Sequence, residues 1–235
     1  MITSVILAYT ALTSAFTSSI FSAATRSVAT HFHVSTEVGV LGTTLYVLGF
    51  ATGPTLWAPF SELRGRRLPI VIGMFGFTIF SIAVAAAKDL QTVMICRFWS
   101  GFFAACPLAV VAAIFSDMFD NRTRGLALLV FSACVFCGPL LAPFIGGFIN
   151  QSYLGWRWTE WIASIMGAVA FVLNLFFLEE TYPPIILVTK ASELRRRTKN
   201  WGIHAKQEEI EVDFRELITK NFVSSRPYPF LLYLY

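Results

Sequence analysis

The chain has 235 residues, of which 56% are hydrophobic and 14% are charged, and its mean hydropathy is +0.65. A soluble domain usually carries about 25% charged residues, so the composition excludes a water-soluble globular protein. The net charge of +4 does not indicate a nucleic-acid partner, because the basic residues adjoin long apolar runs, where they act as signals of membrane topology.

Six apolar runs dominate the first part of the sequence. A helix needs about 20 mainly apolar residues to cross the hydrocarbon core of a bilayer, and we expect each run to form such a helix. The predicted bounds are 2–24, 38–60, 69–87, 92–115, 125–149 and 161–178. The sequence therefore predicts an all-α membrane protein in which residues 1–180 form a six-helix transmembrane bundle.

Lysine and arginine gather on one side of these predicted spans. They occur at 64–67, 122–124 and 190–206, whereas each intervening loop holds a single basic residue. Because cytoplasmic loops carry the excess of basic residues, the loops after the second, fourth and sixth spans are expected to be cytoplasmic. The chain is therefore predicted to be a multi-pass protein with both termini in the cytoplasm.

The first predicted span contains hydroxyl residues within its apolar sequence: Thr10, Thr13, Ser14, Thr17 and Ser18. Such side chains either line an aqueous pathway or bond backbone carbonyls and neighbouring helices, and their clustering favours a pathway. The loop that follows holds His31 and His33, which are more typical of solvated residues than of a metal or pH-sensing site.

The loop after the second span combines a carboxylate, a glycine turn and paired arginines. Glu62, Gly65, Arg66 and Arg67 can exchange ion pairs with neighbouring helix ends while the loop stays tight. Asp117, at the cytoplasmic end of the fourth span, is the expected local partner of one arginine. An arginine cluster alone would indicate only an ordinary basic cytoplasmic loop.

The fourth span carries a charge, Arg97, inside its apolar run, followed by Gly101. On insertion scales an arginine costs about 2.5–3.5 kcal/mol at the centre of a membrane helix, and less near an end. One interpretation is an interfacial arginine whose guanidinium reaches the membrane surface. The other, slightly favoured, is an arginine that faces the interior of the bundle.

The fifth span contains two prolines four residues apart among small residues. Proline removes a backbone donor and bends a helix, and glycine lets helices approach closely. The residues concerned are Gly138, Pro139, Pro143, Gly146 and Gly147. The segment is either a kinked packing helix or a helix built to pack tightly and to pivot. In the second span, Gly49 and Gly53 predict close helix contact.

The sequence shows no catalytic triad, phosphate-binding loop or cluster of metal ligands, so we expect neither an enzyme nor a cofactor or metal. The four cysteines lie inside apolar segments, which argues against a disulfide framework or a zinc site. A membrane enzyme would need several ionisable groups inside the bundle, and Arg97 is nearly alone there. A channel would need rings of repeated polar residues, which we do not find.

After the sixth span the composition changes to prolines and then to charged residues of alternating sign. We expect residues 181–225 to form a central cytoplasmic loop with amphipathic helical pieces. This loop is either a solvated linker, which we favour, or a helix that lies on anionic lipid through Arg195, Arg196, Arg197 and Lys199. Residues 226–235 turn apolar again, as expected for the start of a truncated next span.

Several of these segments together resemble the major facilitator superfamily. The loop from Ala58 to Arg67 resembles motif A, Arg97 with Gly101 resembles motif B, and the fifth span resembles motif C, the antiporter motif. The segment 155–158 (Gly-Trp-Arg-Trp) is similar to the fungal drug:proton antiporter branch. The segment 179–184 (Glu-Glu-Thr-Tyr-Pro-Pro) narrows the resemblance to the polyamine and cycloheximide-resistance transporters of that branch. Three positions depart from the usual motifs: Ala58, Leu63 and Ala142.

The resemblance implies that the chain is the N-terminal half of a twelve-span fold. Glu62 would be the gating carboxylate, Gly65 the turn, and Arg66 with Arg67 the partners of a nearby helix end in the outward-facing state. Arg97 would assist proton coupling. The resemblance assigns no substrate-binding residue.

The implied function is proton-coupled efflux of small drug-like or polyamine compounds by alternating access. The expected partners are the lipid bilayer, the substrate, protons and a missing C-terminal half. The expected location is the plasma membrane, with the vacuolar membrane as an alternative. Because one wall of the cavity is missing, we expect no transport by this chain alone. Two alternatives are a truncated, non-transporting fragment and a six-helix channel or membrane enzyme.

Overall fold

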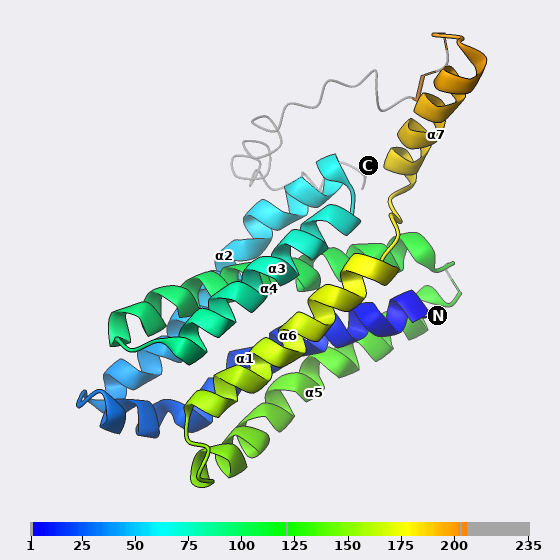
Figure 1. Cartoon of the computed structure of the whole chain (residues 1–235). Helices are drawn as coiled ribbons and strands as arrows, with labels where there is room; N and C mark the ends of the chain where they lie inside the picture. The colour runs from blue at the N-terminus through cyan, green and yellow to red at the C-terminus, as the bar shows by residue number, and fades with distance from the viewer. Residues whose placement is uncertain (1, 121, 203, 206–235) are drawn as a thin grey trace, which may run out of the picture.

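The computed structural model describes residues 2–120, 122–202 and 204–205. Within these ranges the chain forms seven α-helices and no β-strand (Figure 1). The helices are α1 Ile2–His31, α2 Thr36–Arg64, α3 Arg67–Ala86, α4 Leu90–Met118, α5 Arg124–Gln151, α6 Arg157–Phe177 and α7 Pro183–Thr198. The predicted all-α class is confirmed, and the expected segment 226–235 lies outside the described residues.

The first six helices lie side by side in one bundle, and α7 projects beyond the end of α6 (Figure 1). Helix α1 packs against α2, α4, α5 and α6, whereas α3 packs mainly against α4 and α6. The interior is filled by buried side chains, including Leu7, Tyr46, Met74, Phe77 and Ile114. Because four helices of the bundle contact α1, polar groups on α1 meet partners from several directions.

Five of the described helices, α1, α3, α4, α5 and α6, are long and apolar enough to cross a membrane. Helix α2 has 29 residues, but glycine, threonine and proline make its sequence less apolar. Its glycines lie on its buried face: Gly39, Gly42, Gly49 and Gly53. Five of the six predicted spans thus coincide with membrane-capable helices, and a membrane-spanning role for α2 over 38–60 stays a prediction.

Glycines allow α2 and α4 to approach until their backbones touch. A β-carbon on Gly49 would lie 2.8 Å from the backbone nitrogen of Phe102, and one on Gly101 would lie 2.8 Å from the carbonyl carbon of Tyr46. A β-carbon on Gly53 would lie 2.7 Å from the carbonyl oxygen of Phe102. Side chains cannot occupy such positions, so the close contact predicted from Gly49 and Gly53 is confirmed.

Several helices extend beyond the predicted spans. Helix α1 continues to His31 rather than ending at residue 24. Helix α6 begins at Arg157 rather than at 161, because Gly155, with φ of 72°, turns the chain and Trp156 becomes the N-cap residue. The earlier start of α6 places Glu160 inside the helix.

Helix α7 stands apart from the bundle (Figure 1). Two prolines occupy its first turn, where their missing N–H groups are not needed, and Lys199 ends it with a φ of 53°. A pocket near this end is lined by Ser192, Arg195, Arg196, Lys199 and Trp201. The first part of the expected loop 181–225 is therefore helical, while its remainder from 206 onward lies outside the described residues.

Candidate functional site

The loop between α2 and α3 contacts the end of α4 through Arg66. The buried guanidinium of Arg66 donates to the hydroxyl of Ser61 at 2.8 Å and to the carboxylate of Asp117 at 3.4 Å. Its Cζ lies 4.8 Å from the centre of the Tyr182 ring, which adds a cation–π contact. Arg66 thus joins the ends of α2 and α4 to the segment that follows α6.

The same loop is held by a second carboxylate, Glu180, which the sequence reasoning missed. Glu180 accepts hydrogen bonds from the backbone N–H groups of Arg66 at 2.9 Å and Arg67 at 3.2 Å, and from the two N–H groups that follow it. A carboxylate is favoured at the start of α3 because unpaired N–H groups and the helix dipole carry partial positive charge there. The signal for it is an acidic residue just after the last span, at the same end of the bundle as the arginine loop.

Glu62 and the side chain of Arg67 lie outside this contact. Glu62 is exposed and forms no hydrogen bond or ion pair with any described residue. The exposed Arg67 side chain donates to the backbone carbonyl of Leu175 on α6 at 3.1 Å. Of the residues predicted for this loop, Gly65 and Arg66 take part in its contacts with the end of α4 and with the segment that follows α6. Asp117, the predicted partner on α4, takes part as well.

Arg97 has no exposed surface and lies where α1, α2, α4 and α6 meet. Its Nη2 forms an ion pair with Glu160, and its Nη1 donates to the carbonyl oxygen of Thr17 at 3.4 Å. Its Cζ lies 4.0 Å from the ring centre of Phe21 and 5.5 Å from that of Tyr46. The interpretation of a surface-reaching arginine is therefore wrong, and Arg97 faces the interior of the bundle.

Glu160 is the second residue that the sequence reasoning missed. It is 1% exposed and lies in the first turn of α6, so both members of the ion pair are buried. The predicted start of the span at 161 left Glu160 in an outer loop, and the expectation that Arg97 is nearly alone is corrected. Removing two charges from water is costly, so such a pair inside membrane helices marks a candidate functional site.

An apolar layer separates this buried pair from the end of the bundle opposite the arginine loop. The layer comes from the end of α1, the end of α3, the beginning of α4 and the residue before α6. Its members include Phe21, Val28, Val84, Val93 and Trp156. The layer therefore lies between the ion pair and the end of the bundle that the distribution of basic residues predicts to be the outer one.

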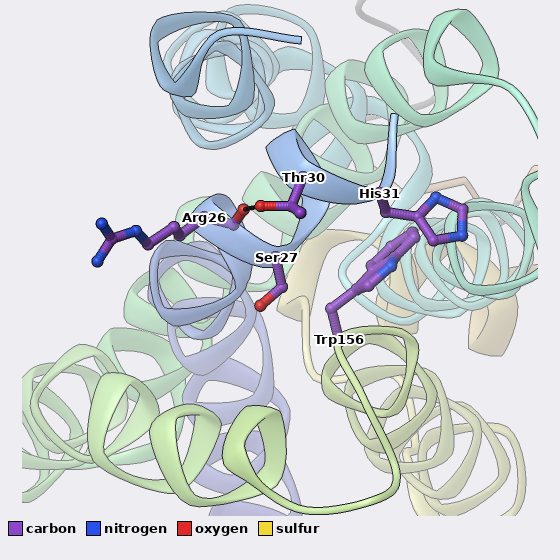
Figure 2. A pocket seen from close by; sticks show the side chains of 5 residues that line it. All are labelled: Arg26, Ser27, Thr30, His31 and Trp156. Atoms are coloured by element: carbon purple, nitrogen blue, oxygen red, sulfur yellow. Dashed lines mark hydrogen bonds between the residues drawn. The ribbon is translucent and has the colours of Figure 1, made fainter. Parts of the chain in front are cut away.

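A shallow pocket opens on the far side of that layer, lined by Arg26, Ser27, Thr30, His31 and Trp156 (Figure 2). Figure 2 shows the rings of His31 and Trp156 beside each other, with centroids 5.8 Å apart, whereas the Arg26 side chain points away from them. The described residues hold no group of three or more potential metal ligands. Trp156 belongs both to the apolar layer and to the pocket lining, so it forms the boundary between them.

Of the five hydroxyl residues predicted in the first span, Thr10, Thr13, Ser14 and Thr17 are buried, whereas Ser18 is half-buried. Thr10, Ser14 and Thr17 each donate to the carbonyl oxygen four residues earlier, at 2.7 to 3.2 Å. Tyr46 donates to the carbonyl oxygen of Ser14 at 2.9 Å, and Asn174 donates to the hydroxyl of Thr10 at 2.8 Å. For Thr10, Ser14 and Thr17 the favoured pathway interpretation is therefore wrong in this structure, because these groups bond the backbone and neighbouring helices. For Ser18 it stays a prediction.

Small residues of α5 pack directly on α1. A β-carbon on Gly138 would lie 2.9 Å from the backbone nitrogen of Phe16, and one on Gly146 would lie 2.9 Å from the carbonyl oxygen of Ile20. Ala142, between these glycines, is fully buried. The spacing of four residues places all three on one face of α5, which is the face that contacts α1.

The other residues predicted for this segment are Pro139, Pro143 and Gly147, of which Pro139 and Gly147 are half-buried and Pro143 is exposed. Helix α5 continues through Pro139 and Pro143, and a β-carbon on Gly147 would meet no atom within 4 Å. The remaining surface of α5 exposes large apolar side chains, among them Phe136, Leu140, Phe144 and Phe148. Helix α5 thus has one covered face and a wide uncovered one.

A sequence model of the Major Facilitator Superfamily matches residues 6–234, which is nearly the whole chain. The chain belongs to the major facilitator superfamily. The resemblance drawn from the arginine loop, the arginine of the fourth span and the fifth span is therefore confirmed for the family. Membership also places this protein among multi-pass membrane proteins of a transporter family.

Fungal transporters are among the relatives of this major facilitator. The chain is 50% identical to the transporter C36.02c of Schizosaccharomyces pombe, over 99% of this chain and 41% of that protein. It is 53% identical to the multidrug transporter TPO1_2 of Candida glabrata, over 86% of this chain and 35% of that protein. The chain therefore spans less than half of the length of these relatives.

The fold of this major facilitator is also similar to that of a solved transporter. The proton:xylose symporter XylE superimposes with a TM-score of 0.71, over 93% of this chain and 51% of XylE. The sequences are only 15% identical, so this likeness shows the fold alone. The helices of the bundle thus correspond to about half of such a transporter.

Proposed function

We propose that this chain forms one half of a proton-coupled exporter of small drug-like or polyamine compounds, which works by alternating access in the plasma membrane. The multidrug transporter of Candida glabrata supports this substrate class. The observation that carries the proposal is the fully buried ion pair of Arg97 and Glu160. Ionisable groups inside a membrane bundle are costly, and they mark pathways of substrates, ions or protons.

In this proposal, the contact between Arg66 and Asp117 is a cytoplasmic latch. Arg66 holds α2 to α4, and Glu180 holds the start of α3 to the end of α6, so the cytoplasmic ends of these helices move as one unit. Glu62 lies exposed at the same end and is the carboxylate that would pair with the second half. Closure at this end then requires both halves.

The uncovered face of α5 supports the need for that second half. Within α5 the buried residues are Phe131, Gly138, Ala142 and Gly146, and the last three face α1. A wide apolar face with only lipid against it provides no wall for a substrate cavity. The chain alone is therefore proposed not to transport, and α5 is proposed to pivot on its small-residue contact with α1.

Reconstitution of the two halves tests this function. The chain is expressed alone, and also together with the part of the Schizosaccharomyces pombe relative that it does not match, in inside-out membrane vesicles with an imposed proton gradient. Uptake of labelled spermidine and of a cationic dye is measured. We expect saturable uptake that an uncoupler abolishes when both halves are present, and none with either half alone.

Two results would contradict the proposal. Saturable, uncoupler-sensitive transport by this chain alone would show that no second half is needed. Transport by the paired halves that continues unchanged after the proton gradient is collapsed would show that protons do not drive it.

A further inference from the structure

The three guanidinium nitrogens of Arg97 differ in their hydrogen-bond partners. Glu160 meets Nη2 of Arg97, whereas Nη1 reaches the carbonyl oxygen of Thr17 at 3.4 Å and Nε has no hydrogen-bond partner. The faces of the Phe21 and Tyr46 rings supply the remaining attraction for the guanidinium. Arg97 therefore keeps favourable contacts when the carboxylate loses its charge.

The carboxylate, by contrast, depends on one cation. Among the described residues, Arg97 is the cation that forms an ion pair with Glu160. Arg157, on the same helix, donates instead to the carbonyl oxygen of Ala87 at 3.0 Å. The Tyr46 hydroxyl, the titratable group that α2 brings to the site, donates to the carbonyl oxygen of Ser14.

Of the other elements packed against α6, α1 brings two titratable side chains to this end of the bundle, Arg26 and His31, and both line the outer pocket beyond the apolar layer. Residues 77–86 of α3 and 138–151 of α5 contain no titratable side chain, and α1 offers a carbonyl group at Thr17 and the Phe21 ring. The pair is neutral overall when the carboxyl is ionised, and it carries one positive charge when the carboxyl is protonated. Binding of one proton therefore breaks the ion pair between Glu160 and Arg97.

One turn of α6 separates Glu160 from Trp156, which lines the outer pocket. Trp156 and Glu160 are four residues apart at the start of α6, so their side chains lie one above the other on the same face. Trp156 also lines the outer pocket (Figure 2). A rotation of this indole, or a small tilt of the start of α6, would open a path from that pocket to the carboxylate.

We propose that Glu160 is the group that binds and releases the coupled proton, and that Arg97 is the positioning residue that couples this event to movement of the helices. The inference rests on the proposed proton-coupled function. A proton from the outer solution adds to a carboxylate oxygen of Glu160 and forms a carboxylic acid, while Arg97 stays protonated and faces the two rings. Release of the same proton toward the cytoplasm restores the carboxylate and the ion pair, and no electrons are transferred.

Infrared difference spectroscopy of the 235-residue chain in lipid nanodiscs tests whether this carboxyl titrates. Spectra are recorded between about pH 5 and pH 8, where histidine is the one side chain with an unperturbed pKa in the range, so a buried carboxyl band stands out. We expect a carbonyl stretch of a protonated carboxyl that appears as the pH falls and that shifts on labelling of glutamate with carbon-13. Glu160→Gln removes this band, whereas Glu37→Gln, at an exposed position, leaves it unchanged.

A second variant guards against misfolding of Glu160→Gln. Glu160→Asp keeps a carboxyl at the site. The band is therefore expected to remain, but it no longer shifts on labelling of glutamate with carbon-13. If no glutamate band titrates in the unsubstituted chain, or if the band survives in Glu160→Gln, the assignment of the proton to Glu160 is overturned. This outcome is independent of any transport measurement, so it is distinct from failure of the proposed export function.

Transport by the paired halves distinguishes whether Glu160 carries the proton or has only a structural role. In Glu160→Gln, exchange of labelled for unlabelled spermidine at equal concentrations is expected to stay within about twofold of the unsubstituted pair, while accumulation driven by the proton gradient falls about tenfold or more. The rate of exchange is also expected to lose its dependence on pH. Parallel loss of exchange and of driven accumulation would indicate a structural role and would refute the inference.

Discussion

A β-carbon on Gly65 would lie 2.7 Å from Cδ of Glu180, so the carboxylate that caps α3 occupies the space that a side chain at Gly65 would need. Gly65 also has a φ of 91°, a conformation that residues with a side chain adopt only under strain. Gly65 therefore determines both the turn of the arginine loop and the space in which the Glu180 carboxylate lies.

Substitution of Gly65 by alanine is expected to destabilise the chain. The positive φ costs about 1–3 kcal/mol for a residue with a β-carbon, and displacement of the Glu180 carboxylate adds to it. The free energy of unfolding is measured by titration with a denaturing detergent in mixed micelles. Gly125→Ala is the matched control, because a β-carbon there meets nothing within 4 Å. Equal free energies of unfolding for the two variants would contradict the described position of the Glu180 carboxylate against Gly65.

Neutralisation of Glu180 is expected to weaken the same region by a different route. Glu180→Gln loses the charge-assisted hydrogen bonds to the start of α3, which are worth about 1.5–3 kcal/mol together with the interaction with the helix dipole. Glu179→Gln, next to it and exposed, is expected to change the free energy of unfolding by less than about 0.5 kcal/mol. Hydrogen exchange of the Arg66 and Arg67 amides should rise only in Glu180→Gln. An unchanged exchange rate would argue against the cap.

Adjacent glycines of α5 are expected to respond in opposite ways to a large side chain. Gly146→Leu forces α5 away from the backbone of Ile20 and is expected to cost about 1–3 kcal/mol through overpacking. Gly147→Leu enters open space and should leave stability unchanged or slightly improved, because glycine is a poor helix former. Thermal unfolding in detergent, followed by circular dichroism, compares the two. A larger loss in Gly147→Leu would show that α5 is rotated from the described orientation.

The buried ion pair is expected to show strong coupling in a double-mutant cycle. Arg97→Met leaves the Glu160 carboxyl without its cation, and the loss of one partner of a buried pair costs about 3–5 kcal/mol. Arg97→Met combined with Glu160→Leu should cost less than the sum of the single substitutions, because no uncompensated charge remains. Arg26→Met, at an exposed arginine, controls for a general effect of losing a positive charge. Additive costs would argue against direct contact between Arg97 and Glu160.

Local sequence patterns were sufficient to predict the apolar helices and the arginine loop. Apolar runs report directly on burial in lipid, and the spacing from Glu62 to Arg67 reports on a tight turn between two helix ends. The partner of that loop on α4, Asp117, was predictable because loops at the same end of a bundle lie near one another. These features depend on neighbours in sequence or on membrane side, both of which the sequence reveals.

Glu160 and Glu180 were missed because their roles depend on contacts between distant segments. Glu160 enters α6 only because Gly155 turns the chain before it, and its burial depends on Arg97, which lies 63 residues earlier. Glu180 is fixed by amides that lie more than 100 residues away in the sequence. In both cases an acidic residue lies beside an apolar run, where the local sequence pattern predicts the boundary of a span.

The position of Glu160 late in the sequence also has a consequence for biosynthesis. Arg97 leaves the ribosome 63 residues before Glu160, so α4 enters the membrane while its counter-ion has not yet been made. During that interval the Phe21 and Tyr46 rings, already synthesised, are the available neighbours of the guanidinium. The nascent chain therefore lacks the counter-ion of Arg97 until α6 arrives, and the buried ion pair forms only after that.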